Sequence, residues 1–507
     1  ATAMAAPAIN VSLGDLLSTA KPAKARRKAR GQPRAAKEDG GQPSEGKEGG
    51  QPFEGKEGGH SGQRAAGGQA GAMSDSAQEH STGLPSDTAS HILWQRLRQV
   101  DEMLDLSRRD EMVRALVAHT LLPMFPTATV TIFGSSASGL RGRSSDVDLC
   151  VTLPEIPAKS TLEKQRVFLI ANLLLKSGAF AKIEPIARAS VPLVKCFCVP
   201  LNVNCDVVPS AEIGVHNSAL LKAYSACHPL SRQLILLVKL WASQRKICNA
   251  AEHHLSSYGH VLTCIHFCLA GASPPLVDDL LSPEAVNGVS SRMCRGFDVR
   301  FGEGSSCSLQ QLRDEAPGLA TVALQYFEYM LQHWQDHVLS LRAGDGTFRF
   351  SKHRWGHEDA KLKETLARLS IEDPFEGIMS QRPHDIGRSC TLQKFKQLRE
   401  EWERAAGLLR RCHSDPASSQ EAIAKLLEEV YPDSAPRWVK NAHGRRVDSD
   451  GQAYTALEFL EYYGQQAARS KWRKAKELNE ADSKVRTTEE LELQFQRTDL
   501  NDRSQPI

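Results

Sequence analysis

Five short segments of alternating apolar and polar residues constrain the fold of this chain more than any other feature. An alternation with a period of two is typical of strands that bury one face. The segments span residues 128–133, 146–153, 180–187, 193–199 and 201–208. A helical pattern at residues 162–175 interrupts them. This part of the chain therefore predicts a small α/β unit built on a mixed sheet.

The apolar spacing changes to that of helices from residue 217 to about residue 429. One helix there has a single apolar stripe, formed by Leu230, Leu234, Leu237, Val238 and Trp241. We predict an α+β fold with a small mixed-sheet domain over residues 124–216 and a larger, mainly helical domain over residues 217–430. A helix over residues 89–123 is expected to pack on the helical domain, and a cleft to separate the two domains.

The amino-acid compositions of the two ends of the chain differ from that of the central part. Residues 1–88 contain the near-repeats GGQPSEGKEG and GGQPFEGKEG and predict a disordered, basic and Gly-rich arm. Residues 431–478 form a small appendage in which Trp472 lies among basic residues, and residues 479–507 form a charged tail. The appendage fits either an RNA-binding element or a small helical hairpin with a solvated face.

Charge and cysteine usage bear on the compartment. The net charge of +3 is too small to identify a nucleic-acid binder, but residues 1–36 alone carry seven basic residues and one acid. Such an arm suits an organellar transit peptide, a nuclear-import patch or a plain solvated tail. The twelve cysteines, many of them in apolar runs, favour a reducing compartment. We expect an intracellular protein without a membrane span, in the cytoplasm, with a mitochondrion, plastid or nucleus left open.

The segment from Phe133 to Leu149 carries the most specific chemistry. Gly134 and Ser135 follow a strand and form a turn whose backbone N–H groups can face a phosphate. Asp146 and Asp148 then share one face of the next strand, about 6.5–7 Å apart. Two such carboxylates repel each other unless a cation lies between them, and Mg²⁺ suits oxygen ligands of this kind.

A third carboxylate, Asp206, lies on the polar face of the segment 201–208. If that strand lies beside Asp146-x-Asp148, the three aspartates can hold two metal ions, Mg²⁺ or Mn²⁺. Two ions and a phosphate-binding turn indicate nucleotidyl transfer by in-line attack.

These residues resemble the DNA polymerase β-like nucleotidyltransferase superfamily. Later segments narrow the resemblance to the terminal uridylyltransferases and atypical poly(A) polymerases, and the matches span about residues 91–400. The segments are LLVKLWA at 236–242, LSSYGHVL at 255–262, IEDPFE at 371–376 and RPHDIGRS at 382–389. The resemblance implies a helical domain of the poly(A) polymerase-associated type.

The resemblance also implies a nucleotide site. Lys239 and Ser257 match positions that hold the triphosphate, and Tyr258 matches the aromatic residue that stacks on the base. His384 matches a histidine of the UTP-specific members, where a donor can meet uracil O4. The further expected nucleotide contacts are Gly134, Ser135, Ser145, Asn217, Ser218, Asp373 and Glu376.

The chain departs from the family pattern in three places. Ser243 stands where a second lysine is usual, and Arg245 or Lys246 are the residues that can compensate. Ala211 replaces a residue that is often polar. The loop between Glu376 and His384 is longer than in relatives.

The predicted activity is the template-independent addition of uridines from UTP to the 3′ end of single-stranded RNA by a monomer. The sequence leaves two alternatives open, an ATP-preferring poly(A) or oligo(A) polymerase and an inactive RNA-binding scaffold. Protein partners are not indicated.

Overall fold

The computed structural model describes residues 88–101, 107–142, 145–155, 160–189, 191–304, 318–335, 337–342, 348–352, 367–377 and 384–430, and parts of 439–477. The predicted arm, apart from Thr88, and the predicted tail lie outside the described residues.

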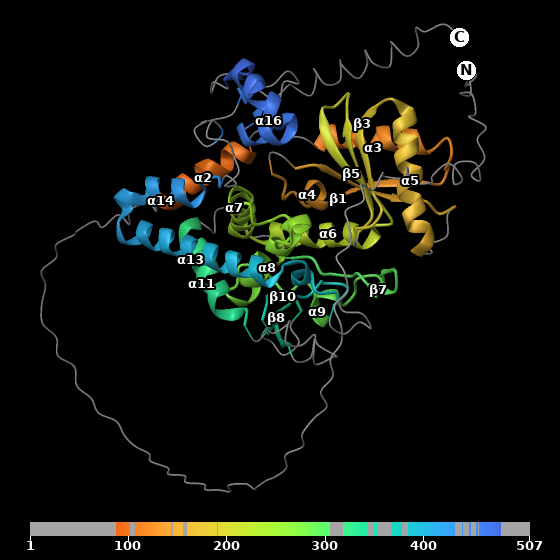
Figure 1. Cartoon of the computed structure of the whole chain (residues 1–507). Helices are drawn as coiled ribbons and strands as arrows, with labels where there is room; N and C mark the ends of the chain where they lie inside the picture. The colour runs from red at the N-terminus through yellow and green to blue at the C-terminus, as the bar shows by residue number, and fades with distance from the viewer. Residues whose placement is uncertain are drawn as a thin grey trace, which may run out of the picture. The chain divides into compact units, whose positions relative to one another are not determined.

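A five-stranded mixed sheet has the order β1-β2-β5-β4-β3 (Figure 1). Its strands are β1 (Thr129–Phe133), β2 (Val147–Thr152), β3 (Phe180–Ile186), β4 (Leu193–Cys198) and β5 (Val203–Pro209). β2 and β5 pair in parallel, and the other neighbours pair antiparallel. The five predicted strands and the α+β class are confirmed.

The helices α3 (Ser107–Leu121) and α5 (Ser160–Ser177) cover one face of this sheet. On that face, Val147, Leu149 and Val151 of β2 join a buried core with Val113 and Val117 of α3. The alternate residues of β2 and β5, which include the aspartates, lie on the opposite face. The core therefore holds the sheet from one side and leaves the other side for polar chemistry.

The helix expected over residues 89–123 is two helices that pack on different cores. α2 (Thr88–Asp101) buries Ala89, Leu93 and Leu97 in the core of the helical domain, as predicted. α3 instead packs on the sheet, because its apolar residues recur every four positions and face β1 and α5. The prediction therefore holds only for α2.

Six helices supply most of the second core: α6 (Glu212–Cys227), α7 (Pro229–Gln244), α8 (Ser257–Ala270), α11 (Leu319–His333), α13 (Leu392–Ser414) and α14 (Ser419–Leu426). The predicted stripe of α7 is buried there except for Leu230, which is partly buried against the same core, and Trp241 meets Phe327 edge to face with ring centroids 4.9 Å apart. α6 begins before the predicted boundary at residues 216 and 217, so that boundary falls inside a helix. The short elements of this region are η1 (Ala250–Glu252), α9 (Pro283–Val286), η3 (Ile386–Ser389), η4 (Pro416–Ser418) and the hairpin β6 (Met293–Cys294) with β7 (Phe297–Asp298).

A small sheet within the helical domain has the order β10-β8-β9 and was not predicted. It consists of β8 (His337–Leu339), β9 (Arg349–Ser351) and β10 (Ser370–Ile371). β10 runs directly into Asp373, so this sheet determines where that acid lies.

The appendage contains β11 (Arg446–Val447), β12 (Ala453–Tyr454), α16 (Ala456–Lys474) and β13 (Lys476–Glu477). Trp472 is buried against Phe459 with ring centroids 5.2 Å apart, and the Arg446 guanidinium lies 5.1 Å from the Trp472 ring. The aromatic residue that suggested base stacking is therefore used to pack the appendage itself.

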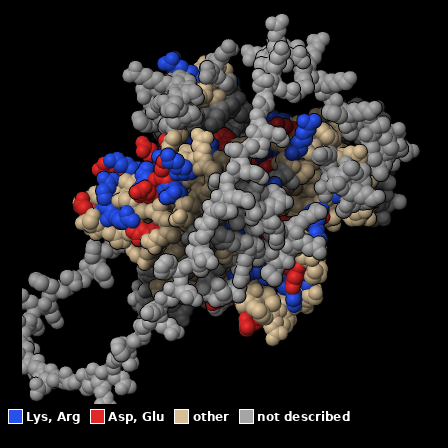
Figure 2. All heavy atoms as spheres, turned by 60° about the horizontal axis from the view of Figure 1, so that its bottom comes forward, with Lys and Arg blue, Asp and Glu red and all other residues tan. Residues whose placement is uncertain are grey.

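The surface at α13 and α14 carries charges of both signs and does not form a purely basic or purely acidic patch. Figure 2 shows basic and acidic side chains intermixed there, on the left of the view. Among the described residues, no helix is both long and apolar enough to cross a membrane. The described cysteines are free thiols, and most of them are buried.

A buried ion pair joins α3 to the segment that precedes Asp146. Asp110 pairs with Arg141, whose side chain is 9% exposed, and Arg141 also donates to the Ser145 carbonyl at 3.0 Å. Asp110→Ala should lower the free energy of unfolding by about 3 kcal/mol, because it leaves a buried guanidinium unpaired. Chemical denaturation measures this. Glu111→Ala is the control, since its pair with Arg114 is exposed and should contribute less than about 1 kcal/mol. Equal losses in the two variants would contradict the prediction.

Candidate functional site

Three aspartates meet on the open face of the sheet. Asp148 on β2 is the register partner of Asp206 on the parallel neighbour β5. Asp146 precedes β2 by one residue and hydrogen-bonds to the Asn204 side chain. The expectation that the strand of Asp206 lies beside Asp146-x-Asp148 is confirmed.

The electrostatics of these carboxylates favour a bound cation. Burial, followed by the charges of Asp206 and Asp146, raises the pKa of Asp148 to about 7. Burial and Asp206 also raise the pKa of Asp146. A positive charge placed between the carboxylates would stabilise their ionised forms.

Lys195 is a charged residue at this site that we did not predict. It lies on β4 directly opposite Asp206, and its Nζ is 3.1 and 3.3 Å from the two Asp206 carboxylate oxygens. Burial alone lowers the pKa of Lys195, but the charge of Asp206 and this hydrogen bond raise it above its ordinary value. The alternation of β4, which puts Lys195 on the polar face, was the available signal.

The Gly134-Ser135 turn forms the first residues of the short helix α4 (Gly134–Ser138). Gly134 has a φ of +66°, and a Cβ there would lie 2.2 Å from Asp148 Oδ2, so glycine is required on both grounds. The Gly134 N–H donates to Ser218 Oγ at 2.7 Å, and the Ser135 N–H donates to Asp148. The turn thus holds Asp148, and buried Ser218 holds the turn.

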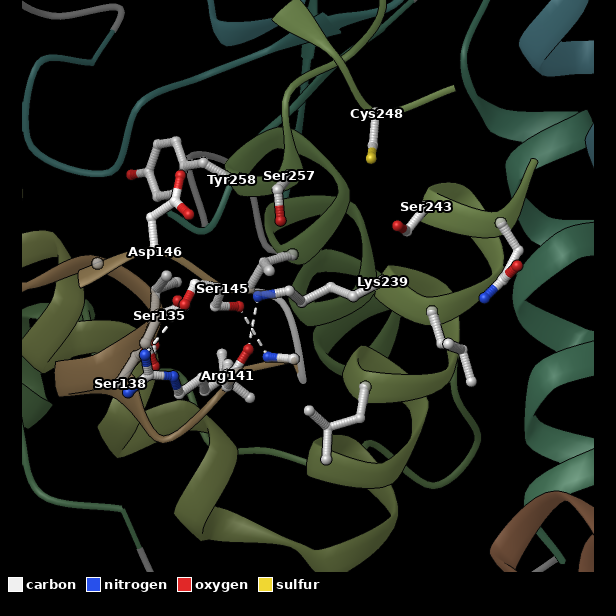
Figure 3. A pocket seen from close by; sticks show the side chains of 18 of the residues that line it. Ser135, Ser138, Arg141, Ser145, Asp146, Lys239, Ser243, Cys248, Ser257 and Tyr258 are labelled. Atoms are coloured by element: carbon white, nitrogen blue, oxygen red, sulfur yellow. Dashed lines mark hydrogen bonds between the residues drawn. The ribbon is translucent and has the colours of Figure 1, made fainter. Parts of the chain in front are cut away.

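A cavity of about 1000 Å³ extends from Asp146 and Asp148 into the helical domain. Its lining includes the following predicted nucleotide contacts: Gly134, Ser135, Ser145, Asn217, Ser218, Lys239, Ser257 and Tyr258. In Figure 3, Lys239 extends from α7 toward Ser145, and Ser243 and Cys248 lie at the far side from Ser135. This volume accommodates a nucleoside triphosphate.

Two features of the cavity suit a phosphate chain. Lys239 Nζ donates to the Leu140 carbonyl at 2.5 Å, and burial lowers the pKa of Lys239 to about 8, although Asp148 opposes the shift. Ser257 is exposed in the first turn of α8, where the helix presents N–H groups and a positive dipole end.

Ser243 stands where relatives usually have a second lysine, and the structure distinguishes the two residues expected to compensate, Arg245 and Lys246. Arg245 pairs with both carboxylate oxygens of Glu401 at 2.8 and 2.9 Å and is committed to that contact. Lys246 lines the cavity, with its Nζ 3.2 Å from Glu429. Of the two residues expected to compensate, Lys246 is therefore the one that lines the cavity. Ala211 lies at the N-cap of α6.

A second polar group gathers around Asp373. Asp373 Oδ2 accepts hydrogen bonds from Asn217 Nδ2 at 3.4 Å and from the Tyr258 hydroxyl at 3.3 Å. His384 Nδ1 lies 3.5 Å from Glu376 and 4.0 Å from Asp373. The hydrogen bond to Glu376 raises the pKa of His384 above its ordinary value, against the effect of burial.

The potential metal ligands form two separate groups. Among the described residues, Asp373, Glu376 and His384 form the group whose ligand atoms all lie within 4.8 Å of one another. The carboxylate oxygens of Asp146, Asp148 and Asp206 do not all lie within that distance of one another. We interpret the group around Asp373 as a hydrogen-bonding site, because its members already pair with one another and with Asn217 and Tyr258.

The backbone places His384 despite the longer loop before it. The Asp373 N–H donates to the His384 carbonyl at 3.1 Å, and the His384 N–H donates to the Glu376 carbonyl at 2.8 Å. Next to His384, Asp385 accepts from the Ile371 and Gly387 N–H groups and pairs with buried Arg368 at 2.7 Å. These contacts hold both ends of the loop, whose residues 378–383 lie outside the described residues.

Comparisons with known proteins agree with this geometry. The family model of the central palm domain of mitochondrial-like poly(A) RNA polymerases matches residues 88–226. Terminal uridylyltransferase cid1 of Schizosaccharomyces pombe is 28% identical over 304 residues, which cover 56% of this chain and 69% of the relative. Poly(A) RNA polymerase cid13 of the same organism is 30% identical over 336 residues, 65% of this chain and 54% of the relative. Poly(A) RNA polymerase GLD2-A of Xenopus laevis is 26% identical over 323 residues, 63% of this chain and 59% of the relative.

A solved structure of the Cid1 poly(U) polymerase with Mg 3′-dATP bound matches with a TM-score of 0.54 and 25% identity, over 67% of this chain and 98% of that chain. The sheet and the three aspartates are as expected for a DNA polymerase β-like nucleotidyltransferase, and the chain is similar in sequence and fold to terminal uridylyltransferases and poly(A) RNA polymerases.

The raised pKa of Asp148 predicts a stability that depends on pH. Since the folded-state pKa of about 7 exceeds the ordinary 3.8, the metal-free protein loses stability as the pH rises from about 4 through 7. Asp148→Asn removes the charge and should stabilise the metal-free protein at pH 8 by an amount on the order of 2 kcal/mol.

Thermal unfolding in the presence of a chelator measures this difference, which should shrink as the pH falls toward 4. Added Mg²⁺ should raise the melting temperature of the unmodified protein and not that of Asp148→Asn. A stabilisation by Asp148→Asn that is equal at pH 4 and pH 8 would contradict the assignment.

Proposed function

We propose that this protein adds uridines to the 3′ end of single-stranded RNA without a template, using UTP. RNA nucleotidyl transfer is the activity that the names of its relatives describe. The preference for UTP rests on one observation, the position of His384 beside Glu376 and Asp373 in the second polar group.

The three aspartates fit two Mg²⁺ or Mn²⁺ ions, because they offer hard oxygen ligands, and burial followed by mutual repulsion raises the pKa of Asp148 and Asp146. When bound, the ions supply charge neutralisation at the reacting phosphate and activation of the attacking hydroxyl. The chain itself orients the substrates. Lys239 and the first turn of α8 hold the triphosphate, and Asp206 lies where the RNA 3′-hydroxyl must approach.

The base end of the site offers hydrogen bonds that match uracil. Asn217 directs Nδ2 to Asp373, so its buried Oδ1, which has no partner among the described residues, can accept from a ribose hydroxyl or from uracil N3–H. Protonated His384, with Nδ1 toward Glu376, can donate from Nε2 to uracil O4. Adenine would place an amino group against this donor, and the unpaired groups would cost affinity.

The second candidate is an ATP-preferring polymerase. Glu376 and Asp373 are acceptors that could take the adenine amino group, and poly(A) RNA polymerases stand among the relatives. The two candidates differ in base choice only.

Primer extension tests the reaction. A short single-stranded RNA is incubated with Mg²⁺ or Mn²⁺ and each of the four nucleoside triphosphates separately. UTP should extend it, and Asp146→Ala should abolish extension, since no other described side chain replaces that carboxylate. Extension mainly with ATP would establish the second candidate. RNA binding without extension by any nucleotide would indicate the inactive scaffold.

The choice of base should depend on His384 and on pH. His384→Ala should reduce the preference for UTP over ATP by about 1–3 kcal/mol, the value of one charge-assisted hydrogen bond. In the unmodified protein the preference should be greatest below the raised pKa of His384 and fall as the pH passes through it, because the Nε2 donor is lost. His119→Ala, which changes an exposed histidine of α3, is the control. The ratio of kcat/KM for UTP and ATP across pH is the measurement, and a ratio that His384→Ala leaves unchanged would remove His384 from the base site.

A further inference from the structure

The open face of the sheet continues past Asp206 onto β4 and β3. The register places one row of charged residues straight across four strands: Asp148, Asp206, Lys195 and Glu184. Lys195 and Glu184 are exposed, whereas the intervening positions of β4 face the core. A positive charge thus lies immediately beyond the last catalytic carboxylate.

A second row on the same face, two residues along β5 and β4 from Asp206 and Lys195, contains a polar and an aromatic residue. Asn204 on β5 is opposite Phe197 on β4, and Phe197 is opposite Ala181 on β3. Phe197 is partly exposed, and the Nζ of exposed Lys182 lies 4.9 Å from the centre of its ring. Lys182 has a φ of +50° at an irregularity of β3, which turns its side chain toward Phe197.

This face and the nucleotide cavity meet at the aspartates from different sides. The cavity lining includes Asp146 and Asp148, and it includes neither Asp206 nor any residue of β3 or β4. An acceptor strand has to bring its 3′-hydroxyl to the carboxylates without occupying the cavity of the incoming nucleotide. The face of β4 and β3 is contiguous with Asp206 and meets that requirement.

We propose that the last nucleotides of a single-stranded RNA lie across β4 and β3, with a base stacked on Phe197 and phosphates against Lys195 and Lys182. An aromatic side chain on an open sheet, flanked by cations, is a physical basis for binding single strands, because every base has a stacking face and every phosphate a negative charge. Asn204 adds an amide that can reach a base edge or a sugar hydroxyl. The proposal rests on RNA being the acceptor in the proposed function, and it does not depend on which base is added.

The proposal predicts opposite effects on RNA binding for the removal of a positive charge and for the removal of the negative charge of Glu184. Glu184 is the exposed acid of β3 opposite Lys195, so it repels a phosphate at that position. Lys182→Gln should weaken RNA binding by roughly threefold and reduce its dependence on salt by the share of one phosphate contact, about 0.7 in the log–log slope. Glu184→Gln should strengthen binding by roughly twofold. Phe197→Leu, which keeps an apolar side chain and removes the ring, should weaken binding by about tenfold.

The measurement is fluorescence anisotropy of a labelled single-stranded RNA in the absence of any nucleoside triphosphate. Lys176→Gln is the matched control, because Lys176 is an exposed lysine of α5 on the opposite side of the sheet and should leave binding unchanged. In extension assays the KM for RNA should change in the same order, and the KM for the nucleoside triphosphate should stay within about twofold.

A spectroscopic readout separates stacking from a general loss of structure. A 2-aminopurine near the RNA 3′ end should be quenched on binding to the unmodified protein and to Lys182→Gln, and much less on binding to Phe197→Leu. Equal affinities for Lys182→Gln, Glu184→Gln and Lys176→Gln, with the same quenching in Phe197→Leu, would overturn the proposal. Because binding is measured without catalysis, this result is distinguishable from a failure of uridine addition or from a preference for ATP.

Discussion

The parallel pairing of β2 with β5 is the constraint on which the rest of the site depends. Its register sets Asp148 beside Asp206, and a slip of one strand by one residue would turn the carboxylate of that strand into the apolar core. The pairing is unfavourable for the carboxylates themselves, since burial and mutual repulsion raise the pKa of Asp148 to about 7. The apolar face of the same strands, packed on α3 and α5, offsets that cost. The core thus holds a charge cluster that a divalent cation is suited to neutralise.

Cationic side chains lie on two sides of this cluster. Lys239 lies on the side of the cavity, and Lys195 lies on the side of β4. Arg141 is held by Asp110 and by the Ser145 carbonyl, so it orients the segment leading to Asp146. A positive charge on each side of the carboxylates is suited to attract negatively charged molecules to them.

The positions of the residues in the group around Asp373 are set by a different part of the chain. Asp373 follows β10 of the small sheet, and the pair of Arg368 with Asp385 fixes the segment next to His384. Asn217 and Tyr258 reach the same carboxylate from α6 and α8. Asn217, Tyr258 and His384 therefore reach Asp373 from three other segments, which ties this polar group to the packing of the helical domain and not to one loop.

The sequence by itself determined the strands, the alternating faces and the three aspartates, because period-two patterns and Asp-x-Asp spacing are local properties. The family motifs also named Lys239, Tyr258 and His384. Only the tertiary structure decided which strand lies beside which, and with it the place of Lys195 opposite Asp206. It also divided residues 89–123 between two cores and showed that Lys246, not Arg245, lines the cavity. Pairing register and long-range ion pairs depend on residues distant in the chain, and no local pattern encodes them.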